Sequence, residues 1–216
     1  MIVAATPFET GAFARHFDLS LSAGATPGIL TDASAKISLL ITGVGMVNTA
    51  YALGRCPNDF DYVINAGVCG AFNRSIAQGE VLHVVRDTLS EMGAQDDAAF
   101  IPYPDLGLGG THVYHEKLTT HLPGVMGLRA VTGITVNTVH GHEAAIEKAR
   151  ARFNADVESM EGAAFFRGCE HFTGCCIQLR AVSNYVEKRD KSKWNMPLAL
   201  GSLNNFLIQL INDLNT

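Results

Sequence analysis

Apolar runs alternate along the chain with stretches in which apolar side chains return every three or four positions. Uninterrupted apolar runs are typical of buried strands, and the second spacing is typical of amphipathic helices. A glycine-rich turn is expected to join the third and fourth predicted strands. Strands are predicted at residues 1–5, 36–42, 62–66, 79–85, 129–135, 156–159 and 175–183, and helices at residues 7–17, 47–55, 142–153, 162–172 and 197–214.

The regular succession of strand and helix predicts an α/β protein. We expect a three-layer α/β/α arrangement around a mostly parallel central sheet, because repeated β–α–β units put parallel strands side by side with helices on both faces. Ligands in such folds bind beyond the carboxyl ends of the strands. The 216 residues include no linker-like stretch, so residues 1–216 are expected to form a single domain.

Residues 88–120 interrupt the alternation. The segment carries prolines, glycines and isolated aromatic side chains, which predicts an irregular loop. Long irregular inserts in compact domains usually have a function or form an interface. We therefore expect this one to lie near the substrate and to meet a second subunit. Whether it completes the site of its own or of the neighbouring subunit stays open, as does a plain surface excursion.

The charge balance limits the possible partners. A net charge of −5 and a pI near 5.9 argue against binding to nucleic acid or to an anionic membrane, since both need a basic surface. No apolar stretch approaches the ~20 residues of a transmembrane helix. The amino-terminal residues lack a basic leader pattern, and the five cysteines are odd in number with no CxxC spacing. A cytoplasmic protein with reduced, buried thiols is expected.

Two strand ends carry the most informative polar side chains. Residues 157–164 read VESMEGAA, a short strand that turns into a helix with Glu161 at the junction. Residues 179–184 read LRAVSN, a second strand end that finishes in the amide of Asn184. Side by side at the rim of an α/β sheet, one end would hold the hydroxyls of a sugar and the other a heterocyclic base. This pair indicates an enzyme that cleaves nucleosides.

These motifs, together with the glycine-bearing turns at residues 42–48 and 65–70, resemble those of the purine nucleoside phosphorylase and nucleosidase superfamily. The resemblance covers nearly the whole chain. Within the superfamily, residues 65–75, 157–166, 180–189 and 193–197 look most like the futalosine hydrolase family. The resemblance implies a nucleoside phosphorylase-like fold and hydrolysis of an N-glycosidic bond in menaquinone biosynthesis. It also implies a small-molecule nucleoside as ligand, no cofactor, and a homodimer or higher homo-oligomer.

The resemblance also implies roles for two glutamates. Glu161, with the Met160 backbone beside it, would bind the ribose 2′- and 3′-hydroxyls, and its hold would strengthen as positive charge develops on the sugar. Glu9 would be the general base for the attacking water. The spacing of Thr6 and Glu9 also fits a capping box, in which Glu9 only returns to the Thr6 backbone. Glu161 could likewise only stabilise the start of its helix through the helix dipole. The sequence leaves these alternatives open.

Asn184 narrows the substrate. Adenine-specific nucleosidases of the superfamily have an aspartic acid there, and an asparagine cannot deliver a proton, although its amide can donate to N7. This favours an enzyme that releases hypoxanthine over an adenine-specific 5′-methylthioadenosine/S-adenosylhomocysteine nucleosidase. The neighbouring Ser183 is also expected to bind the substrate. A turn or cap role for Asn184 is the structural alternative.

Residues 65–68 bear on the choice between water and phosphate. Asn65 and Val68 stand where a phosphorylase is expected to carry an arginine and a serine, and without a cationic clamp phosphate has little to hold it. Gly67 would let the backbone approach the ribose, or it only makes a tight turn. Val136 and Asn137 would present backbone groups to the base, or they only pack.

A basic run and two pairs of histidines are further features of the sequence. The basic run at residues 188–194 could steer the benzoate on the 5′ side of futalosine or could be a solvated loop. The histidine pairs 140/142 and 112/115 have no nearby third ligand at zinc spacing, so no metal site is expected. A relative that binds nucleosides without catalysis is the alternative from a different functional class.

Overall fold

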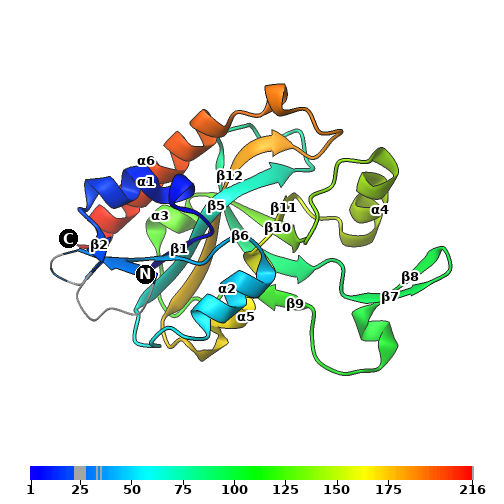
Figure 1. Cartoon of the computed structure of the whole chain (residues 1–216), viewed down its shortest axis with the longest axis horizontal. Coiled ribbons are helices and arrows are strands. Elements are labelled where there is room, and N and C mark those ends of the chain that lie inside the picture. Colours follow the sequence, from blue (N-terminus) through cyan, green and yellow to red (C-terminus); the bar gives the residue numbers. More distant parts are fainter. Residues whose placement is uncertain (22–27, 33, 35, 216) are drawn as a thin grey trace.

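The computed structural model describes residues 1–21, 28–32, 34 and 36–215. Its main feature is a strongly twisted sheet whose strands run in the order β11-β10-β6-β12-β5-β1-β4-β3-β2, with β9 added beside β6 (Figure 1). Strand bounds are β1 (Ile2–Ala4), β2 (Ser20–Leu21), β3 (Ile29–Thr31), β4 (Ser38–Ile41), β5 (Tyr62–Ala71), β6 (Val81–Leu89), β9 (Val113–His115), β10 (Arg129–Thr135), β11 (Val157–Ser159) and β12 (Cys175–Tyr185).

Helices cover both faces of the sheet (Figure 1). Because side chains alternate along a strand, Ile2 of β1 packs in a cluster with Phe13 and Leu203, whereas the adjacent Val3 packs in a second cluster with Phe165. The first cluster lies under α1 and α6, the second under α2 and α5. This is the predicted three-layer arrangement. Helix bounds are α1 (Pro7–His16), α2 (Met46–Leu53), α3 (Pro123–Met126), α4 (Glu143–Phe153), α5 (Gly162–Gly168) and α6 (Met196–Leu214), with short 3-10 turns at Tyr103–Leu106, Cys169–His171 and Lys191–Lys193.

The sheet is mixed, so the prediction of a mostly parallel sheet was wrong. Parallel pairing joins β1 to β4 and β5, β12 to β5, and β10 to β6 and β11. Antiparallel pairing joins β6 to β12 and β9, β3 to β2 and β4, and β11 to β5. The connection from β5 to β6 spans only residues 72–80. A parallel pair needs a crossover of about a dozen residues or more, so β6 runs back in the opposite direction.

One end of the sheet closes on itself. The antiparallel pairing of β11 with β5 completes a ring of strands β5, β12, β6, β10 and β11, whose apolar filling includes Cys69, Leu82, Val131 and Val157. The closure puts strand ends that are distant in sequence at one rim. Gly70 of β5 is in register with Glu158 of β11 on one side and with Asn184 of β12 on the other.

Several local predictions differ from the structure. The glycine-rich turn expected after residue 66 is absent, because β5 continues through Gly67 and Gly70 to Ala71. The insert at residues 88–120 is largely regular. Its strands β7 (Gly93–Asp96) and β8 (Ala99–Pro102) form a separate hairpin that projects from the main sheet, and β9 pairs with β6 (Figure 1).

All five cysteines are buried free thiols, as expected from their number and spacing. Within the residues described here, no helix is long and apolar enough to cross a membrane.

Candidate active site

A cavity of about 320 Å³ opens at the strand ends where the ring of strands meets the first helix. Its volume is within the range of small-molecule sites. Most of its wall comes from the start of α1, the end of β5, the loop before α4, the β11–α5 junction, the end of β12 and the loop leading to α6. The cavity therefore lies beyond the carboxyl ends of β1, β5, β11 and β12, where the predicted fold puts a ligand.

Glu161 is the N-cap residue of α5, directly before its first residue Gly162, and it lines this cavity. Its Oε1 atom accepts a hydrogen bond from the backbone N–H of Gly45 at 3.0 Å, and Oε2 lies 3.8 Å from Nη2 of Arg180. Gly45 has φ of 94°, a left-handed conformation that glycine adopts without strain. The carboxylate is only 6% exposed and is held from two sides, so its oxygens are presented in a fixed orientation.

Glu9 caps α1 and also lines the cavity. Its Oε2 atom accepts hydrogen bonds from the Thr6 backbone at 2.9 Å and from the Thr6 hydroxyl at 3.3 Å, which forms the capping box of α1. Its Oε1 atom accepts a long hydrogen bond, 3.4 Å, from the Val68 N–H, and the side chain lines the cavity. Burial raises the pKa of Glu9, and the charge of Arg180 and the backbone bonds oppose this rise. The hydrogen bonds of the capping box therefore do not draw the Glu9 side chain out of the cavity.

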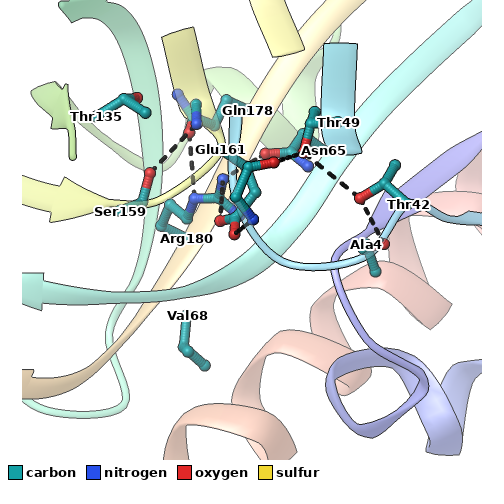
Figure 2. Close-up of polar contacts among 12 residues, drawn as sticks. Ala4, Thr42, Thr49, Asn65, Val68, Thr135, Ser159, Glu161, Gln178 and Arg180 are labelled. Atoms are coloured by element: carbon teal, nitrogen blue, oxygen red, sulfur yellow. Dashed lines mark hydrogen bonds and ion pairs between the residues drawn. The ribbon is translucent and has the colours of Figure 1, made fainter. Parts of the chain in front are cut away.

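A buried polar chain begins at Arg180, which lies beside Glu161 (Figure 2). The guanidinium donates through Nη2 to Oδ1 of Asn65 and through Nε to Oε1 of Gln178 at 3.1 Å. Gln178 donates to Asp87 at 3.1 Å, and Asp87 accepts from the Thr135 hydroxyl at 2.7 Å. Burial raises the pKa of Asp87 to about 6. The chain fixes the positive charge of Arg180 between the two cavity carboxylates.

Arg180 was not among the predicted site residues. A signal for it exists in the sequence, since Gln178 and Arg180 are polar residues two positions apart in a strand predicted to be buried, which places them on one face. A buried charge at such a position needs partners. Asn65 and Gln178 engage two of its nitrogens, so this guanidinium is not a substitute for the phosphate clamp that is missing at residues 65 and 68.

Gly67 of β5 lies next to the Arg180 guanidinium and the Glu9 carboxylate. A Cβ atom there would come within 3.0 Å of both Arg180 Nη1 and Glu9 Oε1. Gly67 does not line the cavity and does not form a turn. It is the point where β5 passes close enough for the arginine and the glutamate to meet.

The other end of the cavity carries Asn184 and Ser183. A bulge between Val182 and Asn184 interrupts the pairing of β12 with β5, and bulges of this kind redirect side chains. The Asn184 amide donates to the Tyr185 carbonyl at 2.9 Å, and its oxygen lies 2.8 Å from the Ser183 hydroxyl. One hydrogen of the amide is left for a ligand.

The cavity brings together five of the predicted site residues: Glu9, Met160, Glu161, Ser183 and Asn184. Val136 and Asn137 are not brought to it. Val136 is fully buried with its N–H bonded to Ser159, and Asn137 is bonded to Glu91. The wall here is formed slightly later in the same loop, at residues 139–141.

The basic run at residues 188–194 and the insert at residues 88–120 differ in whether they contribute to the cavity wall. From the basic run, Lys188, Arg189 and Trp194 line the cavity. Among the described residues of this one chain, none from the insert at residues 88–120 does so. No cluster of three or more histidine, cysteine, aspartate or glutamate side chains suited to a metal ion occurs in the described ranges.

Comparisons with known proteins agree with this geometry. A family model described as the phosphorylase superfamily matches residues 1–212. The futalosine hydrolase of Thermus thermophilus is 33% identical over 76% of this chain and 76% of its own length. A 5′-methylthioadenosine/S-adenosylhomocysteine nucleosidase of Colwellia psychrerythraea is 29% identical over 79% and 76%, respectively. The solved futalosine hydrolase of Helicobacter pylori has the same fold, with a TM-score of 0.80 at 13% identity over 98% of this chain and 96% of that one.

Proposed function

The chain belongs to the phosphorylase superfamily, and we propose that it hydrolyses the N-glycosidic bond of futalosine in menaquinone biosynthesis, releasing hypoxanthine and dehypoxanthine futalosine. One observation carries the proposal. Two buried carboxylates, Glu9 and Glu161, face one end of a single cavity, and the amide of Asn184 faces the other. The similarity to the futalosine hydrolase of Thermus thermophilus supports this choice of substrate.

Glu161 would hold the ribose through its 2′- and 3′-hydroxyls, with the Met160 backbone beside it. Cleavage of an N-glycosidic bond passes through a sugar with oxocarbenium character. A carboxylate fixed by Gly45 and Arg180 binds such a sugar more tightly as its positive charge grows. Preorganised groups of this kind stabilise the transition state without having to move during the reaction.

Glu9 would take the proton of the attacking water. A general base works best with a pKa near the working pH, and burial shifts the pKa of Glu9 in that direction. Arg180 lies behind Glu9 and Glu161 and would let both ionise in a mostly buried setting. The oxygen of water forms the new bond to C1′, and the electrons of the broken bond leave with the base.

Asn184 would bind the base through N7. Its amide is oriented by the Tyr185 carbonyl and the Ser183 hydroxyl, so its remaining N–H can donate to a ring nitrogen. An amide has no proton to transfer at neutral pH. This favours an oxopurine, which can carry negative charge as it leaves, over adenine. A contact from Val136 or Asn137 to the base is not part of the proposal.

Water, and not phosphate, would be the acceptor. Asn65 is committed to Arg180 and to the Val3 carbonyl, and Val68 offers only its backbone N–H to Glu9. No arginine or lysine among the described cavity residues lies on the Glu9 side. The cationic residues of the wall, Lys188 and Arg189, follow Asn184 instead.

We also propose a homodimer with the single domain of residues 1–216 as its unit. Large exposed apolar side chains lie on α1 and α2: Phe8 (70% exposed), Val47 (80%) and Tyr51 (64%). Phe8 also lines the cavity, so a partner that covers Phe8 would exclude water from the site. A cytoplasmic location is proposed on the basis of the reduced thiols.

The test is to incubate the purified protein separately with futalosine, inosine and 5′-methylthioadenosine, with and without phosphate, and to identify the products. Release of hypoxanthine from futalosine at a rate independent of phosphate is expected. Release of adenine from 5′-methylthioadenosine in preference would indicate the adenine-specific nucleosidase instead. A phosphate requirement with a sugar 1-phosphate as product would indicate a phosphorylase.

A further inference from the structure

His140 and Glu158 form a hydrogen-bonded pair in the wall of the cavity, and the scheme above gives them no role. The ring Nδ1 of His140 lies 2.7 Å from one oxygen of Glu158, and the backbone N–H of His140 donates to the other at 3.0 Å. Both carboxylate oxygens therefore hold the same residue. With Nδ1 engaged in this way, Nε2 is the ring nitrogen that the imidazole can present to a ligand.

The pair lies at the end of the cavity that contains Asn184. Glu158 and Asn184 are in register with Gly70 from opposite sides. A Cβ atom on Gly70 would lie 3.3 Å from Nδ2 of Asn184 and 3.6 Å from Cγ of Glu158, so the two side chains converge over this glycine. Gly67, beside Glu9, is three residues away along β5, which is about 10 Å in an extended strand. Glu9 and Asn184 line the same cavity, which suits a nucleoside whose sugar lies at Glu9 and whose base lies at Asn184.

Glu158 is 4% exposed, and a carboxylate buried to this extent favours a positively charged neighbour. The hydrogen bond to Glu158 raises the pKa of His140, burial opposes the rise, and the charges of Glu158 and Glu91 add to it. The charged groups on the nearby wall are Glu187, Lys188 and Arg189. An imidazole with a raised pKa, hydrogen-bonded to a buried carboxylate, thus lies where the base would bind.

We propose that His140, as an imidazolium held by Glu158, donates a hydrogen bond from Nε2 to the 6-oxo group of the leaving purine while Asn184 donates to N7. The inference rests on the proposed function and adds a specificity-determining residue to it. As the glycosidic bond breaks, its electron pair moves onto the base and increases the negative charge on the 6-oxo oxygen. A charged donor strengthens its bond at that moment. A 6-amino group would present N–H to the same donor, which disfavours adenine.

The experiment compares futalosine with its analogue that carries unsubstituted purine in place of hypoxanthine. His140→Gln should lower kcat/KM for futalosine about 10- to 100-fold, the range expected for a hydrogen bond to a charged group, and leave the analogue within a few-fold of the wild-type rate. Glu158→Gln should show the same selectivity, because Glu158 acts by positioning His140. The matched control His142→Gln changes an exposed histidine outside the cavity wall and should behave as wild type with both substrates.

The pH profile gives a second readout. Wild-type kcat/KM for futalosine should fall as pH rises through the raised pKa of His140, since the imidazolium is the donor, and the profile for the analogue should lack this fall. Equal losses of His140→Gln on both substrates, or no loss on either, would overturn the inference while leaving the proposed function in place. If the wild-type protein released no hypoxanthine from futalosine, the proposed function would be refuted and the inference with it.

Discussion

Replacing Gly67 by alanine tests the close approach on which the catalytic end of the cavity depends. The new methyl carbon would come within 3.0 Å of Arg180 Nη1 and Glu9 Oε1, closer than real Cβ atoms come to other atoms. The guanidinium cannot simply swing away, because Asn65 and Gln178 hold it by hydrogen bonds and it is only 1% exposed. Either the arginine or the glutamate must move.

The size of the effect follows from that conflict. Extra methyl groups in a well-packed interior typically lower the free energy of unfolding by about 1–3 kcal/mol. For a chain of this length, each kcal/mol lowers Tm by about 2–4 °C. A displacement of a catalytic group by about 1 Å can reduce the rate about 100-fold. Gly67→Ala is therefore expected to lower Tm by about 2–12 °C and the rate of hypoxanthine release about 100-fold.

The assay combines thermal unfolding with the rate of hypoxanthine release. Gly201→Ala is the matched control, since it lies in α6 and a Cβ atom there meets nothing within 4 Å. That control should keep full activity and gain about 0.5–1 kcal/mol from the helix preference of alanine. If Gly67→Ala unfolded at the wild-type temperature and turned over at the wild-type rate, the packing of Arg180 and Glu9 against β5 would be refuted.

Three other substitutions test separate parts of the account. Glu9→Gln should abolish turnover while futalosine still binds and Tm changes little, because glutamine can also complete the capping box with Thr6. The kcat of the wild-type protein should fall as pH drops through the raised pKa of Glu9. Retained turnover in the variant would show that Glu9 only caps α1. Asn184→Asp should lower activity on 6-oxopurine nucleosides and introduce activity on 6-amino ones. The rates are measured with futalosine and with its analogue that carries adenine in place of hypoxanthine. An unchanged preference between the two substrates would refute the role of the amide. Asp87 has its folded-state pKa raised from 3.8 to about 6, so its contribution to stability is complete below pH 4 and is lost as pH rises through 6. Urea unfolding of wild type and Asp87→Asn should therefore show the wild type losing about 3 kcal/mol relative to the variant between pH 4 and pH 7, at about 1.4 kcal/mol per pKa unit, and a constant difference would contradict the buried ionisation.

Most elements of the fold could be predicted from the sequence because their signals are local. The spacing of apolar side chains located the main helices, and α1 and α6 begin close to the capping residues Thr6 and Asn195. Strand direction has no such signal. The reversal of β6 follows from the short connection after β5, and the pairing of β11 with β5 that closes the ring is a contact distant in sequence.

The candidate site was predicted where a strand end carries its own polar side chain, as at Glu161 and Asn184. The sequence does not reveal which residues face the cavity where tertiary packing decides their orientation. Val136 and Asn137 follow β10 directly, but Val136 turns into the core and Asn137 towards Glu91, so His140 faces the cavity instead. The role of Gly67 depends in the same way on its close approach to the distant Arg180, and no local pattern reveals that contact.

The most direct measurement is a crystal structure of the Glu9→Gln variant soaked with futalosine. The 2′- and 3′-hydroxyls of the ribose are expected within hydrogen-bonding distance of Glu161. A water molecule is expected between residue 9 and C1′, with the N7 atom of hypoxanthine facing the amide of Asn184. A ribose bound away from both residue 9 and Glu161 would contradict it.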